Sequence, residues 1–256
     1  MEPDQPAPTS AQTVYRHRLT TRLWHWINAI TIFIMIGSGL MIFNAHPHLY
    51  WGEYGANYDH AWFHGSWIWG GNGRFPGWLT IPQSYNLALA RRWHLIFALV
   101  LGFGLLAFMI ASLINRHFQR DLRVRAKEIA PKHLIADAAA HARFEFHNPD
   151  DPAAYNTLQK LAYVAAIFIL IPVMILTGLA MSPGMDAAWP WLTAMFGGRP
   201  SARSVHFIAA SLLVGFIVVH LALVILAGPI EEVRSMITGW WKLPPIEPQR
   251  ETEVPE

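Results

Sequence analysis

Residues 205–227 read VHFIAASLLVGFIVVHLALVILA, an apolar run long enough to cross a membrane that contains two histidines. His206 and His220 lie fourteen residues apart within it. At about 3.6 residues per turn and about 1.5 Å of rise per residue, both side chains leave roughly the same helix face, about 21 Å apart along the axis. A polar ring deep in an apolar helix needs a partner and usually marks function. The stretch therefore predicts a membrane helix with functional histidines at two depths.

The rest of the chain is that of a multi-spanning membrane protein. Of its 256 residues 53% are hydrophobic and 14% are charged, and the mean hydropathy is +0.26. Three further apolar runs, 24–43, 93–113 and 161–181, also have spanning length. We therefore predict an all-α bundle of four transmembrane helices in a membrane domain of residues 15–243, between disordered tails at 1–14 and 244–256. No small-residue cleavage site follows the first run, so we expect that helix to be retained.

The distribution of basic residues predicts the orientation of the helices. With the N-terminus in the cytoplasm, only five of the 19 basic residues would lie outside: Arg74, Arg91, Arg92, Arg199 and Arg203. This bias favours both termini in the cytoplasm. The basic residues concentrate beside membrane helices as topology demands, which makes nucleic-acid binding improbable.

Two connecting segments have distinctive compositions. The outside connection 44–92 holds five tryptophans among tyrosines, glycines and prolines, so it predicts an ordered periplasmic cap rather than a free linker. The inside connection contains residues 133–146, whose apolar spacing predicts a short amphipathic helix at the cytoplasmic surface.

Orientation and helical rise pair four histidines by depth. His25 opens the first run at the cytoplasmic side and His94 opens the second at the periplasmic side, whereas His206 and His220 mark the two depths of the fourth. Depth pairs His94 with His206 and His25 with His220. The chain has no cysteine, which excludes cysteine-ligated clusters and thioether-attached haem, so iron here would be held by histidine or methionine. We therefore predict two haems b, each with two histidine axial ligands. Taken singly, His25 and His94 can equally be interfacial histidines at helix ends.

Haem propionates are anions and need cations near the interface. Arg22 and Arg203 stand within one turn of His25 and His206, so we predict that they bind the propionates. Each is also placed where an ordinary snorkelling side chain would be.

Four motifs resemble the prokaryotic cytochrome b561-type membrane subunits of formate dehydrogenase, nickel–iron hydrogenase and thiosulfate reductase. They are Arg22-Leu-Trp-His-Trp26, Arg91-Arg-Trp-His94, Tyr155-Asn-Thr-Leu-Gln-Lys160, and His206 with His220 at their spacing. The resemblance covers all four spans and implies the same pairing of haem ligands. It also implies a quinone site beside the cytoplasmic haem, near Asn156 and His220. From the residues alone, Asn156 can instead cap the third helix.

The resemblance implies an electron-transfer subunit of the bacterial inner membrane, between a periplasmic redox partner and the membrane quinone/quinol pool. The aromatic loop resembles a subgroup grouped with the thiosulfate reductase b subunits. Some members of that subgroup accompany exported molybdopterin oxidoreductases, which are one candidate partner. The alternative is a self-sufficient oxidoreductase that exchanges electrons between quinone and a small periplasmic molecule such as superoxide. A histidine-lined transporter without haem is a third hypothesis, which leaves the depth pairing unexplained.

His60 and His64 have the i to i+4 spacing of a helical metal site, with Asp59 adjacent. The favoured interpretation is that they are interfacial histidines beside aromatic residues.

Overall fold

Four long helical segments dominate the computed structural model, which describes residues 13–56, 59–143 and 155–243. All four are long and apolar enough to cross a membrane, which confirms the predicted four spans: α1 (Leu19–Phe43), α3 (Leu87–Ile114), the continuous segment Thr157–Met181, and α10 (Arg199–Ala227). Large apolar side chains on every span are more than half exposed, as lipid contact requires: Phe33, Phe103, Ile169 and Val218.

The helices end where the apolar runs predict, but they begin four to six residues earlier. Polar first turns lower the hydropathy without preventing a helix from starting. Asn86 precedes α3 and its side-chain oxygen accepts a hydrogen bond from Leu89 N at 3.0 Å, which satisfies a free amide of the first turn. Gly198, at φ +105°, precedes α10, and Pro200 occupies its first turn.

The third span changes its hydrogen-bond pattern in the middle. It consists of α6 (Thr157–Ala165), the π-helical segment η2 (Ala166–Leu170) and α7 (Ile171–Met181). Pro172 has no amide hydrogen to donate and its ring crowds the preceding turn, so the helix widens just before it.

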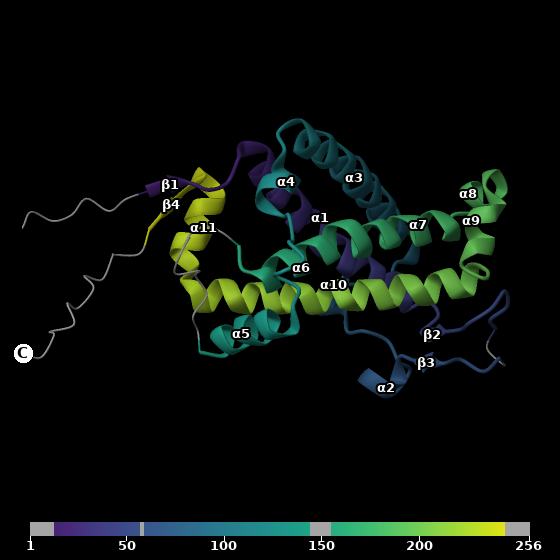
Figure 1. Cartoon of the computed structure of the whole chain (residues 1–256). Coiled ribbons are helices and arrows are strands. Elements are labelled where there is room, and N and C mark those ends of the chain that lie inside the picture. The colour runs from purple at the N-terminus through teal and green to yellow at the C-terminus, as the bar shows by residue number, and fades with distance from the viewer. Residues whose placement is uncertain (1–12, 57–58, 144–154, 244–256) are drawn as a thin grey trace, which may run out of the picture.

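The spans are arranged as two packed hairpins. Helix α1 packs along α3 to form one hairpin, and α10 packs along α7 to form the other. Apolar side chains make the contact between the two hairpins. The main apolar core lies there, with Leu105 and Phe108 from α3, Ile167 from η2, Ile171 from α7 and Leu213 from α10. The two hairpins lie side by side along the bundle (Figure 1).

One end of the bundle carries the connection of residues 44–86, which we call the cap, and we call this end the cap end. Within the cap, β2 (His48–Leu49) pairs antiparallel with β3 (Phe63–His64), followed by α2 (Ser66–Trp69) and η1 (Gly77–Leu79). Helices α8 (Pro183–Ala188) and α9 (Pro190–Met195) lie at the same end (Figure 1).

Polar contacts attach the cap to the helix ends. Ser204 of α10 donates a hydrogen bond to Tyr50 O at 2.6 Å and accepts one from Trp62 Nε1 at 2.9 Å. Asn44, at the end of α1, makes two hydrogen bonds with the backbone of Phe75. The described part of the cap is therefore held against α1 and α10.

The opposite end, which we call the terminal end, holds the short elements α4 (His117–Asp121), α5 (Pro131–Ala142) and α11 (Pro229–Thr238). The predicted amphipathic helix corresponds to α5, and the rest of that prediction, from residue 144, lies outside the described residues. Strand β1 (Thr13–Tyr15) pairs with β4 (Trp240–Lys242), and the side chain of Trp241 in β4 is buried. The prediction of disorder is therefore wrong for Thr13 and Val14, because the alternation Thr-Val-Tyr finds a strand partner. The other predicted tail residues lie outside the described range.

Candidate functional site

The structure brings the four predicted histidines together in two pairs. At the terminal end, His25 of α1 faces His220 of α10 with ring centroids 6.3 Å apart and an interplanar angle of 62°. At the cap end, His94 of α3 faces His206 of α10 with centroids 6.2 Å apart and an angle of 60°. These are the pairs that depth predicted, and each pair joins one hairpin to the other.

The spacing of the rings fits a metal held between two imidazoles. A metal bound to both Nε2 atoms at about 2 Å leaves the ring centroids about 6 Å apart, since each centroid lies about 1.1 Å behind its nitrogen. Both pairs match this separation. Within the described ranges no three histidine, cysteine or carboxylate side chains gather to hold a metal ion, so each pair offers two axial ligands and no more. Two axial histidines with the equatorial positions open are what a haem iron requires.

The two pairs differ in what holds their rings. His94 Nδ1 lies 3.0 Å from Ser38 Oγ, and His206 Nδ1 lies 2.9 Å from Thr177 Oγ1. His25 Nδ1 is buried and has no hydrogen-bond partner in the described part of the chain. The sequence reasoning missed Ser38 and Thr177, because a hydroxyl in an apolar helix usually bonds its own backbone and reveals nothing about a facing helix.

Aromatic side chains surround the terminal-end pair. Phe216, one turn before His220, stacks on its ring at 5.8 Å, and Tyr163 of α6 meets the same ring at 6.3 Å. Tyr155 packs against Tyr163 at 5.4 Å, and its hydroxyl lies 3.4 Å from Nδ1 of the buried His17. An aromatic path thus runs from the polar surface of the terminal end to His220.

Asn156 lies at the N-cap of α6. Its side chain accepts from the backbone of Gln159, whose own side-chain oxygen accepts from Asn156 N at 3.3 Å, so the two residues form a capping box. Asn156 therefore has the helix-capping role that was the alternative to quinone binding. Asn156 follows Tyr155 in the chain, and ring contacts connect Tyr155 through Tyr163 to His220.

Arg22 and Trp26 connect the start of α1 to α11. Arg22 donates to Ile237 O, and Trp26 Nε1 donates to Met236 O at 3.2 Å. Arg22 Nε is buried and has no hydrogen-bond partner within the described ranges, so it can donate to a further acceptor. No sequence pattern indicated α11, so the contact of Arg22 with this helix was missed.

Arg203 lies one turn before His206 and binds the cap. Its guanidinium donates to His46 O at 2.6 Å and lies over the Phe43 ring. It lines a cleft of about 230 Å³ with His46, His48, Arg199 and others. Burial, then the charge of Arg203, lowers the pKa of His46, and burial, then His64, lowers the pKa of His48. Both imidazoles are therefore neutral at pH 7, and the arginines carry the charge of the cleft.

The structure does not support a metal site at His60 and His64. These residues are not on a helix: His64 belongs to β3 and pairs with His48, whereas the carboxylate of Asp59 accepts from Ala56 N at 2.7 Å in a turn. The i to i+4 spacing therefore does not place the two histidines on one face of a helix. Phe63 and His64 form the strand instead, and Trp62 N donates to Leu49 O at 3.0 Å just before it.

An apolar cleft of about 610 Å³ lies between α1, α10 and residues 78–83. Phe33 and Ile36 of α1 and Val214 and Val218 of α10 line it, at positions between the two histidine pairs along these helices, and Leu221 lines it beside His220. Its volume is in the range of about 300–1,000 Å³ usual for small-molecule sites.

Comparison with known proteins identifies the family of the chain. The chain is 28% identical to YedZ1 of Azospira oryzae, named as a protein-methionine-sulfoxide reductase subunit, over 80% of this chain and 87% of the relative. It is 22% identical to a Ni/Fe-hydrogenase B-type cytochrome subunit of Cupriavidus necator, over 90% of this chain and 88% of that protein. No solved structure matches the chain. The model of the prokaryotic cytochrome b561 family, which implies b-type haem, matches residues 16–239. That range contains all four apolar helices and both histidine pairs, so the chain belongs to the prokaryotic cytochrome b561 family.

Proposed function

We propose that this membrane protein is a di-haem cytochrome b that transfers electrons between a redox partner at the cap end and quinone at the terminal end. The observation that carries the proposal is the presence of one facing histidine pair near each end of the bundle, each with the ring spacing of a metal held between two imidazoles. His206 and His220 share one helix and lie about 21 Å apart along it. The two pairs therefore define a path across the membrane rather than a single centre.

In this proposal His25 and His220 ligate one haem, and His94 and His206 ligate the other. When bound, each haem supplies a one-electron carrier whose potential depends on its ligands, hydrogen bonds and burial. The residues of the chain orient the ligand rings and exclude water from the apolar core. Arg22 and Arg203 are proposed to bind propionates, which is supported by the unpartnered Arg22 Nε and by the unpartnered His46 Nε2 beside Arg203.

Quinone is proposed to react beside the terminal-end pair. Phe216 and Tyr163 present aromatic faces around His220, on which a quinone ring can stack. Leu221, the next residue, lines the apolar cleft, which suits a hydrocarbon tail. Asn156 is the proposed hydrogen-bond donor to quinone, in addition to its observed capping role.

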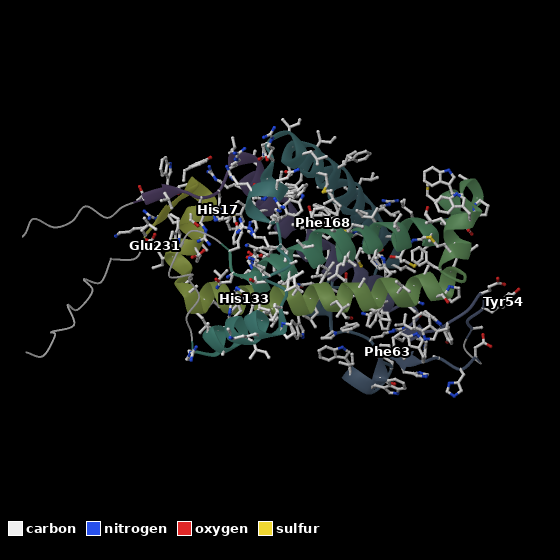
Figure 2. All side chains as sticks on the ribbon, in the orientation of Figure 1. His17, Tyr54, Phe63, His133, Phe168 and Glu231 are labelled. Atoms are coloured by element: carbon white, nitrogen blue, oxygen red, sulfur yellow. The ribbon has the colours of Figure 1, made fainter. Side chains whose placement is uncertain are left out.

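A partner oxidoreductase is proposed to dock at the cap, which the predicted orientation places in the periplasm. Two relatives are named as subunits, one of a methionine-sulfoxide reductase and one of a Ni/Fe hydrogenase, so a subunit role is proposed here too. Figure 2 shows Tyr54 at the cap end, opposite His17 and Glu231, and its side chain is 82% exposed. Of the partner classes, we propose a molybdopterin oxidoreductase, on the strength of the resemblance of the cap.

The basic cleft at the cap end favours a second candidate function. Arg199 and Arg203 line it, and an anionic molecule such as superoxide would be attracted there. In that case the purified chain would reduce quinone with a small-molecule donor and no partner. Strict dependence on a second protein would exclude this candidate.

Spectra of purified variants test the main proposal. The unmodified protein should contain two reducible b-type haems per chain. His25→Ala should lose the terminal-end haem and His206→Ala the cap-end haem, each leaving about half of the haem. His133→Ala, which removes an exposed histidine of α5, serves as the matched control and should retain both. A protein without a b-type spectrum, or loss of the same haem in both variants, would overturn the proposal.

A further inference from the structure

Both cap-end histidines face a buried hydroxyl through Nδ1. The Ser38 Oγ–His94 Nδ1 distance is 3.0 Å and the Thr177 Oγ1–His206 Nδ1 distance is 2.9 Å. Ser38 and Thr177 are both 0% exposed, so solvent offers neither ring an alternative partner there. A polar pair buried this deeply is retained only where its hydrogen bond is made.

The direction of these hydrogen bonds follows from the other neighbours of the hydroxyls. Ser38 Oγ lies 2.7 Å from Ile34 O, and Thr177 Oγ1 lies 2.6 Å from Val173 O. A carbonyl oxygen can only accept, so each hydroxyl gives its one proton to the backbone and accepts from the histidine. His94 and His206 therefore carry their proton on Nδ1, which leaves Nε2 free as a ligand.

The hydroxyl comes in both cases from the other helix of the same hairpin. Ser38 of α1 holds His94 of α3, and Thr177 of α7 holds His206 of α10. A glycine follows each hydroxyl residue: a Cβ added at Gly39 would lie 3.4 Å from His94 Cε1, and one at Gly178 would lie 3.7 Å from His206 Cε1. Each ring thus lies against a hydroxyl and the backbone of a glycine, which limits its rotation.

The terminal-end pair has no equivalent support. His25 Nδ1 is buried without a hydrogen-bond partner among the described residues, and the His220 ring packs against the rings of Phe216 and Tyr163. Rings stacked only on aromatic neighbours are oriented by packing, not by an acceptor. The two ends of the bundle therefore differ in how much electron density the ligand rings can donate.

We propose that Ser38 and Thr177 are positioning residues that fix the tautomer and orientation of the cap-end ligands and lower the potential of the cap-end haem relative to the terminal-end haem. The inference rests on the proposed function, because it presumes that the two pairs ligate haems. An acceptor at the outer nitrogen raises the basicity of a ligating imidazole. A more basic ligand favours the oxidised iron, so removing the hydroxyl raises the potential.

A redox titration of both haems in the purified protein tests this. Ser38→Ala and Thr177→Val should each shift the oxidised-to-reduced ratio of the cap-end haem about threefold toward reduction, and the double variant about tenfold, which is about 59 mV for a one-electron couple. The terminal-end haem, assigned as the one lost in His25→Ala, should keep its potential. Thr177→Ser keeps the hydroxyl and should restore the original value.

Ser211→Ala is the matched control. Ser211 donates to Phe207 O at 2.9 Å, the same i−4 bond, but it is exposed on α10 and faces no histidine. It should leave both potentials unchanged. If Thr177→Val loses the cap-end haem while Thr177→Ser retains it, the positioning role is supported as well. Equal shifts of both haems, or none, in a protein that holds both would overturn the inference, whereas a protein without two haems would overturn the proposed function instead.

Discussion

At the scale of single residues, Asn156 allows an observed role and a proposed one to be separated. Asn156→Ala should remove the cap of α6 and cost about 1 kcal/mol of stability, since a free amide of the first turn loses its acceptor. Asn156→Ser keeps an oxygen for the cap but removes the amide donor. If the amide contacts quinone, Asn156→Ser should lower quinone turnover severalfold and leave the melting temperature near that of the parent. Unchanged turnover in a stable Asn156→Ser protein would leave Asn156 with capping alone.

The site residues differ in how far the sequence could predict them. The pairing of His25 with His220 and of His94 with His206 needs only helix direction and rise, both readable from charge bias and spacing. The contacts of Ser38 and Thr177 depend on which face of one helix meets its neighbour, and the weak amphipathicity of a membrane helix does not show this.

At the scale of elements, α10 begins at a glycine that the cap approaches closely. A Cβ at Gly198, where φ is +105°, would lie 2.6 Å from Glu53 Cα. Gly198→Ala should therefore combine about 1–3 kcal/mol of backbone strain with displacement of the cap. Gly228→Ala is the matched control, because φ is +107° there and nothing lies within 4 Å. Limited proteolysis should cleave the cap faster in Gly198→Ala only; equal cleavage in both variants would refute the role of this contact.

The cap should also loosen in acid. Burial, then the charge of Arg203, lowers the pKa of His46 below its ordinary value of 6.5. Burial, then His64 and Arg203, lowers the pKa of His48 as well. Because the folded state disfavours the protonated rings, the stabilising contribution is present above about pH 6.5 and is lost as the pH falls toward the lowered values. Hydrogen exchange in β2 and β3 should therefore accelerate between about pH 7.5 and pH 5.5 after correction for intrinsic rates.

A double variant supplies the control for this effect. His46→Gln with His48→Gln has no imidazole to protonate beside Arg203, so exchange in β2 and β3 should lose most of its acid dependence. Acceleration of the same size in the double variant would show that groups other than His46 and His48 cause it.

The elements also show where hydropathy is a good guide and where it fails. The C-terminal ends of the spans coincide with the ends of the apolar runs, because the chain leaves the helix where it becomes polar. Their starts and helix α11 were missed, since capping and tertiary contacts determine them: Asn86 begins α3, and Arg22 and Trp26 hold the end of α11. Hydropathy averaged over an apolar window shows neither the capping residues nor the tertiary contacts.

At the scale of the whole molecule, both ends of the described chain lie at the terminal end, where β1 pairs with β4 (Figure 1). The helices that connect the spans at this end, α4 and α5, belong to the stretch 116–143, which contains seven of the chain's basic residues: Arg116, Arg120, Arg123, Arg125, Lys127, Lys132 and Arg143. Positive charge is retained on the cytoplasmic side during insertion, so we expect the cap to face the periplasm.

The absence of cysteine from the chain makes this orientation directly measurable. Tyr54→Cys places a thiol on the exposed cap, and Glu231→Cys places one on α11 at the opposite end (Figure 2), where Glu231 forms an ion pair with the exposed Arg234. A membrane-impermeant maleimide added to intact spheroplasts should label Tyr54→Cys, and it should label Glu231→Cys only after lysis. The parent protein has no thiol and should stay unlabelled throughout. The reverse pattern would place the cap in the cytoplasm, and the proposed periplasmic partner and cytoplasmic-side quinone site would then exchange sides of the membrane.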